Sequence, residues 1–398
     1  MEPSQAAAKL SALAVYRDVA EQQPVMSAVT MLAQAVALKD GPTALLSYSR
    51  VFYLLAQAGC DTLGQWVAQA LRWSEGPYPT AVARGCCSAV LEQAARHDVD
   101  TLARLAQIPS EVWLEEIRSY LPPEQRDGVE GLPRWSGEAP FSFETLTQAY
   151  REEGAGLLAR YPAFVWEDGT LVPVANPDCP TGEQLMGYES HRSRVVENTR
   201  ALLAGKYVNN VLLYGESGTG KSATVKHLLT LPGMEKLRLI EADKENLSGL
   251  PALIRSLDGH PLKFIIFIDD LTFDRDDPTY SVLKTILEGG VERRPQNVAV
   301  YATSNRRHLV RQTISERAGD EMDRNETIRE KTSLADRFGI RILYEGLRRD
   351  EYLALVDQLA AQQGCPLASE ELHRRAIAWE RHHGSTTPRT ALQFVLSL

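Results

Sequence analysis

Apolar residues recur at helical spacing through the first 121 residues of the chain, and few β-branched runs interrupt them. Leu63, Val67 and Leu71 illustrate the spacing of three to four residues that places apolar side chains on one face of a helix. Proline, glycine and charged residues then become frequent. This pattern predicts an all-helical N-terminal domain over 1–121 and a linker and connecting segment over 122–182.

The pattern changes beyond residue 183, where short apolar runs alternate with helical patterns. Such alternation is typical of a parallel sheet whose strands are joined by crossover helices. Three further helical patterns follow the last apolar run. We therefore expect an α/β fold, with a parallel five-stranded core over 183–347 and a small helical lid over 348–398. The expected strands are 209–214, 237–242, 264–268, 297–302 and 340–344.

Length, charge and cysteine usage narrow the class of protein. A chain of 398 residues is too long for one ordinary core, so two or three domains are expected. The net charge of −9 leaves nucleic acid not indicated as a general partner. The sequence begins without the pattern of a secretory signal, and no apolar run reaches the roughly 18 residues of a membrane span. The five cysteines are odd in number and show no C-x-x-C spacing, so we expect thiols in a reducing cytoplasm. The short apolar runs lead us to expect no membrane association.

The strongest local signal is a G-x-x-x-x-G-K-S match between the apolar run 209–214 and a helical pattern. Glycines let the backbone approach phosphate oxygens closely, and successive N–H groups then form a nest for anions. Lys221 is expected to contact the β- and γ-phosphates of a nucleotide, and the Ser222 hydroxyl to bind Mg²⁺. The predicted nucleotide-binding residues are Gly215, Glu216, Ser217, Gly218, Thr219, Gly220, Lys221 and Ser222.

Two carboxylates and an amide end the next strands and complete a candidate hydrolytic site. Asp269 closes a buried apolar run, where a carboxylate belongs beside a nucleotide-bound Mg²⁺. Asp270 stands where a Glu usually polarises the attacking water, and it is shorter by one carbon–carbon bond of about 1.5 Å. Hydrolysis is therefore expected to be slow or to need a partner subunit. Asn305 is the residue expected to orient the water, with Thr303 as the lesser candidate.

Taken together, these motifs resemble those of the AAA+ superfamily of ATPases. The order is the phosphate loop, the Asp-Asp pair, Ala-Thr-Ser-Asn at 302–305, Asp-Arg-Phe-Gly at 336–339 and Pro-Arg-Thr-Ala at 388–391. The last two look much like the arginine-finger and second-sensor boxes of the bacterial Holliday-junction motor helicases. The chain is more similar still to an uncharacterised bacterial family of AAA+-like ATP-binding proteins with the Asp-Asp form of this motif. The segments that carry that likeness are 187–189, 197–199, 209–215, 287–290, 301–308 and 330–339.

The resemblance implies roles for residues whose spacing alone suggests nothing. Arg337 is the candidate finger that acts on the γ-phosphate bound to a neighbouring subunit, and Arg389 the candidate lid sensor that acts within its own subunit. Gly187 and Tyr188 match the lead-in to an adenine pocket. ATP and Mg²⁺ are the implied cofactors, and a homo-oligomeric ring such as a hexamer is the implied assembly.

Three functions remain open on the sequence. The first is an ATP-hydrolysing ring that remodels an unknown protein partner, and the alternative is a slow ATP-dependent switch or scaffold that recruits partners through the N-terminal helices. A DNA-acting motor is third, because the basic residues are scattered. The densely charged segment 311–330 is interpreted as a solvated helix in preference to a ring-interface or pore element.

Overall fold

The computed structural model describes residues 1–21, 23–272, 278–288, 294–305 and 334–398. The chain divides into two compact units. One unit comprises Met1–Arg160 with Gly259–Pro261, and the other comprises Tyr161–Asp258 with Leu262–Leu398. The expected connecting segment 122–182 is therefore shared between the units. The charged segment 311–330 lies outside the described residues.

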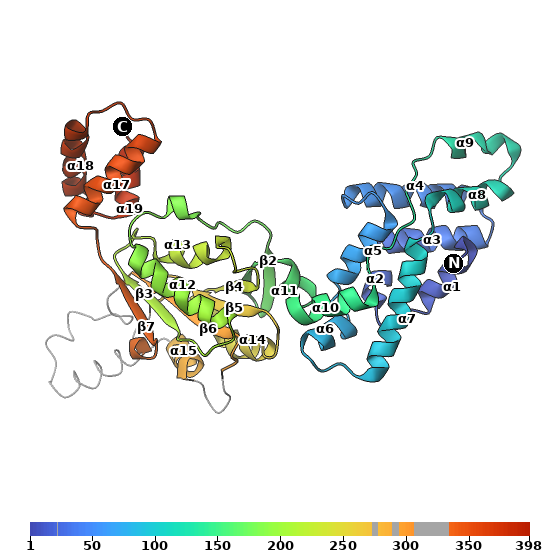
Figure 1. Cartoon of the computed structure of the whole chain (residues 1–398), viewed down its shortest axis with the longest axis horizontal. Coiled ribbons are helices and arrows are strands. Elements are labelled where there is room, and N and C mark those ends of the chain that lie inside the picture. Colours follow the sequence, from blue (N-terminus) through green and yellow to red (C-terminus); the bar gives the residue numbers. More distant parts are fainter. Residues whose placement is uncertain (22, 273–277, 289–293, 306–333) are drawn as a thin grey trace. The chain divides into compact units, whose positions relative to one another are not determined.

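The regular elements among the described residues of the first unit are all helices, as its amphipathic patterns predict (Figure 1). Helices α3 and α4 form an antiparallel hairpin, and α7 and α8 pack with them around one apolar core. The helices are α1 (Pro3–Ser11), α2 (Arg17–Glu21), α3 (Pro24–Ala37), α4 (Gly41–Gln57), α5 (Leu63–Arg72), α6 (Pro77–Ala83), α7 (Ala89–Ala106), α8 (Ser110–Tyr120), α9 (Asp127–Glu130), α10 (Phe143–Glu153) and α11 (Gly156–Arg160).

The proline-rich stretch expected as a linker is packed onto this helical unit. Trp135 is buried and stacks on Tyr48, with ring centroids 4.9 Å apart. Its backbone N–H donates to Ser110 Oγ at 2.9 Å, and its carbonyl accepts from Ser110 N at 3.1 Å. Glu138 N donates to Ala106 O at 3.2 Å. Proline and glycine content indicated irregular backbone correctly, but the apolar anchor inside the stretch holds that backbone in the first unit.

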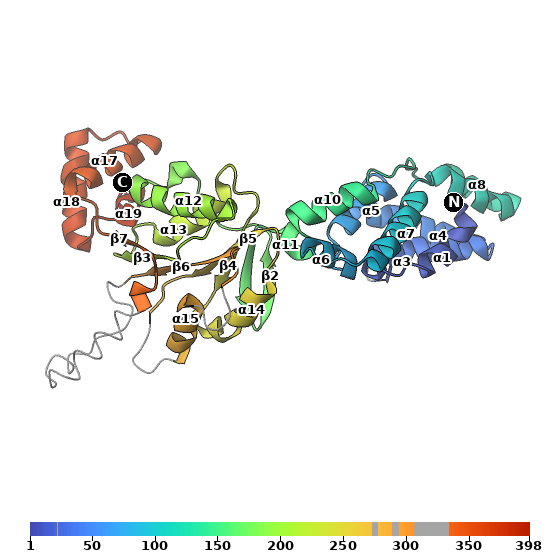
Figure 2. The same cartoon turned by 60° about the horizontal axis from the view of Figure 1, so that its bottom comes forward.

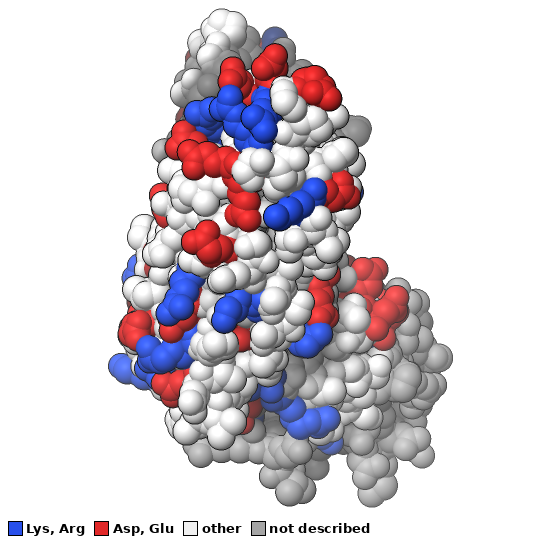
Figure 3. Space-filling model, turned by 90° about the vertical axis from the view of Figure 1, so that its right-hand side faces the viewer, with Lys and Arg blue, Asp and Glu red and all other residues white. Residues whose placement is uncertain are grey.

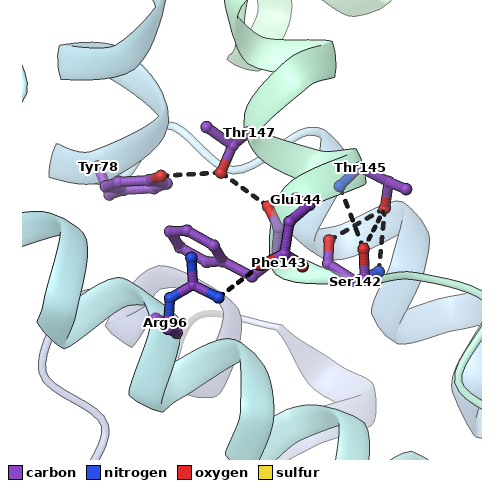
Figure 4. Close-up of polar contacts among 7 residues, drawn as sticks. All are labelled: Tyr78, Arg96, Ser142, Phe143, Glu144, Thr145 and Thr147. Atoms are coloured by element: carbon purple, nitrogen blue, oxygen red, sulfur yellow. Dashed lines mark hydrogen bonds and ion pairs between the residues drawn. The ribbon is translucent and has the colours of Figure 1, made fainter.

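The beginning of α10 shows how this stretch leads into the next helix (Figure 4). The Arg96 guanidinium of α7 lies 4.1 Å from the Phe143 ring centroid and pairs with Glu144 at 2.5 Å. Tyr78 of α6 shares a hydrogen bond of 2.8 Å with Thr147. Contacts from two helices therefore secure the first two turns of α10.

Charges of both signs are interspersed over the face shown in Figure 3. Exposed ion pairs in this unit include Arg118 with Glu130 and Arg134 with Glu111, both at 3.1 Å. Exposed pairs contribute little to stability, typically about 0–1 kcal/mol each. Packing of the apolar core is therefore the main stabilising term for the helical unit.

We predict that Gly64→Ala destabilises the first unit, whereas Gly128→Ala does not. A Cβ at Gly64 would lie 2.0 Å from the Glu138 carbonyl oxygen, whereas a Cβ at Gly128 meets nothing within 4 Å. Overpacking costs about 1–3 kcal/mol, and alanine favours a helix over glycine by about 1 kcal/mol. Thermal unfolding of the whole chain measures both changes, and equal effects of the two variants would contradict the described packing.

The second unit is built on a seven-stranded sheet in the order β2-β1-β4-β5-β6-β3-β7 (Figure 1). All neighbouring strands are parallel except β1 and β2, which form an antiparallel hairpin. The five predicted parallel strands are confirmed. The strands are β1 (Ala163–Glu167), β2 (Thr170–Val174), β3 (Val211–Gly215), β4 (Leu237–Ala242), β5 (Lys263–Ile268), β6 (Val298–Ser304) and β7 (Ile340–Tyr344).

The sheet contains the five predicted strands of the core, β3–β7, and two further strands that precede them in the chain. Residues 163–174, which fall within the expected connecting segment 122–182, form the hairpin β1–β2 and add two strands beside β4. Asp168 and Gly169 at the turn have φ values of 48° and 78°, the left-handed conformation that a two-residue hairpin turn requires. Strand β1 is short and largely buried, so its pattern does not alternate in the way that reveals a half-exposed strand.

Helices cover both faces of the sheet, with α12 and α13 on one face and α14 and α15 on the other (Figure 2). Strands β5 and β6 are buried almost completely, which explains their continuous apolar runs. The helices are α12 (Glu189–Leu203), α13 (Lys221–Lys226), α14 (Leu250–Ser256) and α15 (Pro278–Glu288), with short 3₁₀ helices at Gly182–Gln184, His227–Thr230 and Lys244–Gly249.

Three helices follow β7 and form the predicted lid around an apolar cluster of their own. They are α17 (Arg349–Gln362), α18 (Ser369–His383) and α19 (Pro388–Leu396). A parallel α/β core, a small helical lid and a helical N-terminal unit confirm the predicted fold class. Among the residues described, no helix combines the length and the apolar character needed to cross a membrane.

Candidate functional site

The phosphate loop leaves β3 at Gly215, and its shape explains its glycines. A Cβ at Gly215 would lie 2.1 Å from the Tyr344 carbonyl oxygen on the neighbouring strand β7. Gly218 and Gly220 have φ values of 80° and 87°, which only glycine adopts without strain. Glu216 N donates to the same Tyr344 carbonyl at 2.9 Å. The loop is therefore held against the sheet at the carboxyl ends of β3 and its neighbour β7.

Lys221 is buried beneath this loop, with 5% of its surface exposed. Its ammonium donates to the carbonyl oxygens of Gly215 at 3.2 Å and of Glu216 at 2.6 Å. Burial lowers the pKa of this ammonium, and the carboxylates of Asp270 and Asp269 oppose the shift. A cation held beside an anion nest is suited to phosphate.

Ser222 and Asp269 meet at the carboxyl edge of the sheet, as the sequence predicts. Ser222 Oγ donates to Asp269 Oδ1 at 2.6 Å. Thr303 Oγ1 donates to the same oxygen. The reason lies in the register of β5 and β6, which pairs Ile268 with Ala302 and so brings the next residues of the two strands together.

Asp270 and Asn305 are joined at the same edge. Asn305 Nδ2 donates to Asp270 Oδ1 at 2.8 Å, and both side chains are exposed. Asp270 has a φ of 47°, the left-handed conformation that non-glycine residues adopt uncommonly. Its N–H donates to Thr303 Oγ1 at 2.9 Å and to Asp269 Oδ1 at 3.1 Å. The structure thus brings the two predicted acids and the predicted amide into one hydrogen-bonded group.

A cavity of about 540 Å³ lies beyond β7, between the start of α12 and α17. Gly187 and Tyr188 line this cavity, together with residues that the sequence did not single out. Tyr188 packs on Tyr344 with ring centroids 4.9 Å apart. Burial raises the pKa of the Tyr188 hydroxyl, which donates to the Glu345 carbonyl. The other lining residues are Glu189, Ser190, His191, Leu343, Glu345, Gly346, Leu347, Arg348, Glu351, Ala354, Leu355 and Gln358.

His191 is a structural residue of this cavity that sequence reasoning missed. Its Nε2 lies 3.1 Å from the Leu343 carbonyl, to which it donates on the edge of β7 away from β3. The Tyr188 hydroxyl likewise donates a hydrogen bond to the Glu345 carbonyl. An edge strand leaves such carbonyls unpaired, so these two side chains satisfy the edge while forming the cavity wall. The Gly-Tyr-x-x-His spacing was the available signal, but it is too short to be recognised alone.

The lid meets the phosphate loop directly through Arg389. Arg389 N donates to the Gly218 carbonyl at 3.2 Å, and a Cβ at Gly218 would lie 2.9 Å from Arg389 Cβ. Thr386 and Leu347 exchange two further bonds, of 2.7 Å and 3.0 Å, between the α18–α19 loop and the core-to-lid connection. The predicted lid arginine therefore lies beside the loop of its own chain.

Arg337 is the predicted residue that the structure does not bring to this group. It lies in the turn before β7, where its N–H donates to the Leu334 carbonyl at 3.2 Å. Val211 of β3 pairs with Ile340, and Gly215 pairs with Tyr344. Arg337 therefore precedes the amino end of β7, whereas the phosphate loop follows the carboxyl end of β3.

A magnesium ion bound here would have few ligands from the protein. In the described parts of the chain, no cluster of three or more His, Cys, Asp or Glu could hold a metal. A hydroxyl and a carboxylate in contact, as in Ser222 and Asp269, fit Mg²⁺, which commonly takes one or two protein ligands and completes its shell with water and phosphate oxygens.

Arg294 is a basic residue whose guanidinium is engaged inside the second unit. It donates to Asn210 Oδ1 at 2.5 Å and to the Val208 carbonyl at 2.6 Å, and burial lowers its pKa. These contacts secure the amino end of β3. Arg306 and Arg307, the basic pair beside the predicted site, lie outside the described residues.

A parallel sheet with a glycine loop, a buried lysine and a carboxylate pair at its carboxyl edge defines a P-loop fold. Residues 159–398 match the family described as protein of unknown function (DUF815), and the chain belongs to that family. A search of curated proteins finds no match.

Solved structures of RuvB from Thermotoga maritima are similar to this chain. One is described as a Holliday junction branch migration motor, with 16% identity, a TM-score of 0.35 and coverage of 54% of this chain and 63% of that one. Two single-substitution variants match with 16% identity and a TM-score of 0.35, over 53% of this chain and 62% and 61% of theirs. This chain therefore spans less than two thirds of the structures it matches.

Proposed function

We propose that this protein is an AAA+ type ATPase that binds ATP with Mg²⁺ and hydrolyses it. One observation carries the proposal. Ser222, Asp269, Thr303, Asp270 and Asn305 form a continuous hydrogen-bonded group at the carboxyl edge of the sheet. The buried ammonium of the phosphate loop, which precedes Ser222 in the chain, is the charge that γ-phosphate transfer requires.

Binding would use groups that are already in place. Lys221 would exchange its bonds to two loop carbonyls for bonds to the β- and γ-phosphates. Ser222 donates its proton to Asp269, so its oxygen lone pairs remain for Mg²⁺. The cavity beside Gly187 and Tyr188 would take the base, because a cavity of about 540 Å³ is large enough for a nucleoside and its lining combines the Tyr188 ring with polar side chains such as Gln358.

Hydrolysis would depend on Asp270 and Asn305. Asp270 would accept the proton of the attacking water, and Mg²⁺ would supply charge stabilisation at the phosphate oxygens. Asn305 donates to Asp270 Oδ1 and would orient both the carboxylate and the water. We further propose that the active form is a ring of identical chains, in which Arg337 completes the site of a neighbour and turnover remodels a protein partner.

A slow switch is the second candidate, and the side chain of Asp270 favours it. The carboxylate is one carbon–carbon bond, about 1.5 Å, shorter than the usual glutamate, and Asn305 restrains it further. Asp270→Glu distinguishes the candidates. A higher steady-state ATPase rate would mean that side-chain length limits the chemistry, and an unchanged rate would favour control by a partner.

We predict that the two acids separate functionally. Asp269→Asn is expected to weaken Mg²⁺-dependent ATP binding, because it removes charge from the metal site. Asp270→Asn is expected to retain binding and to lower turnover by about 10²–10⁴-fold, the usual contribution of a general base. Binding of a fluorescent ATP analogue and phosphate release measure the two effects. Equal loss of binding in both variants would contradict these roles.

A further inference from the structure

Thr303 occupies a special place between the two acids of the site. Its hydroxyl donates to Asp269 Oδ1, and its own Oγ1 accepts the N–H of Asp270 at 2.9 Å. Its backbone carbonyl accepts from Leu271 N at 2.7 Å. One residue of β6 therefore contacts three successive residues that follow β5.

Because Thr303 is buried, its hydroxyl depends on these two contacts. Thr303 is 2% exposed, so its hydroxyl needs partners within the protein. A hydroxyl offers one proton and two lone pairs, and the contacts to Asp269 and Asp270 use the proton and one lone pair. Valine would keep the shape of the side chain but provide neither bond.

The first consequence concerns the orientation of the Asp269 carboxylate. Every hydrogen bond that Asp269 accepts from the described residues ends on Oδ1, with Ser222 Oγ, Thr303 Oγ1 and Asp270 N as donors. Oδ2 accepts none from them. Oδ2 is therefore the oxygen that would remain available to a metal ion or to the water of its shell.

The second consequence concerns the backbone of Asp270. A non-glycine residue with a φ of 47° costs free energy and persists only where its surroundings impose it. The Thr303 hydroxyl accepts the N–H of Asp270, while Asn305 Nδ2 donates to its carboxylate. Backbone and side chain are thereby fixed together.

We infer that Thr303 is a positioning residue of this site: its hydroxyl sets the orientation of Asp269 and the left-handed backbone of Asp270 at the same time. This inference builds on the proposed ATPase function but differs from the role first considered for Thr303. Its proton is already donated to Asp269, so Thr303 does not orient the attacking water. Of the two residues considered for orienting the water, Asn305 is the one that keeps this role.

The test without nucleotide is amide hydrogen exchange of the peptide that contains Asp270 and Leu271. Thr303→Val should speed exchange of the Asp270 amide by up to about tenfold, because one hydrogen bond is lost. Thr303→Ser should exchange as the unaltered protein does. Thr285→Val removes an exposed hydroxyl of α15 that bonds only locally, and it should leave this peptide unchanged. Unchanged exchange in Thr303→Val would overturn the inference.

The second arm measures ATP affinity as a function of Mg²⁺ concentration. Thr303→Val should raise the Mg²⁺ concentration needed for half of the affinity gain by about 10–100-fold, as loss of a residue that orients metal ligands usually does. Binding in EDTA should not change, and serine should restore the midpoint. Failure of serine to restore it would overturn the inference, since the methyl group would then be responsible. A third outcome is that Thr303→Val alters the exchange but neither the unaltered protein nor any variant binds ATP. That result would refute the ATPase function and leave the positioning role of Thr303 intact.

Discussion

Lys221→Met is expected to abolish ATP binding without lowering the stability of the fold. The ammonium is the buried cation of the phosphate loop, and no other lysine or arginine within the described residues donates to the loop carbonyls at Gly215 and Glu216. Charge-assisted bonds to phosphate are roughly twice as strong as neutral ones, so their loss removes a large part of the affinity. Binding of a fluorescent ATP analogue at sub-millimolar concentration measures the effect.

Stability separates this prediction from simple unfolding. Burial lowers the pKa of Lys221, which means that folding disfavours its charge. Methionine keeps the stem and removes that cost, so its thermal midpoint should equal or exceed that of the unaltered chain. Lys226 lies on the same helix as Lys221 and pairs with Glu241 of β4, so Lys226→Met is the control that should still bind ATP. Normal affinity in Lys221→Met would refute the nucleotide site.

Arg337→Ala is expected to stop hydrolysis and to spare ATP affinity, whereas Arg389→Ala is expected to impair the site of its own chain. An arginine supplied by a neighbour contributes about 10³–10⁵ in turnover by stabilising charge on the transferred phosphoryl group. Arg337 precedes the amino end of β7, whereas the phosphate loop of the same chain follows the carboxyl end of the neighbouring strand β3. Arg389 contacts that loop through Gly218.

Mixing variants tests the assignment. Arg337→Ala mixed with Lys221→Met should regain part of the ATPase activity, because some interfaces then pair an intact loop with an intact finger. Arg389→Ala mixed with Lys221→Met should gain nothing, since every subunit lacks a group that its own site needs. Recovery with Arg389→Ala alone would reverse the two roles. A fully active protein that sediments only as a monomer would rule out the ring.

Local sequence was sufficient for the parallel strands and for the phosphate loop. A strand buried on both faces must be apolar throughout, as 264–268 is, and a strand–loop–helix with glycines at fixed positions has few alternative conformations. The lid helices followed in the same way from their periodicity. These features depend on residues close together in the chain, so short-range pattern was enough.

The hairpin β1–β2 and the packing of residues 131–141 could not be predicted so well. Trp135 is buried because Tyr48 and Ser110, far away in sequence, lie where it can reach them. Proline and glycine indicated irregular backbone, but nothing in composition distinguishes a free linker from a packed one. Long-range contacts decide between the two, and they are not encoded in local pattern.

For the candidate site, too, local sequence determined some features and long-range contacts decided others. The sequence by itself determined which side chains carry charge and that Asp269, Asp270 and Asn305 end buried strands. Only the tertiary structure decided that β5 and β6 are neighbours, that Thr303 bonds both acids, and that Arg337 lies away from its own loop. The physical reason is that hydrogen bonds act over about 3 Å, whereas the residues they join here are more than thirty positions apart in the chain.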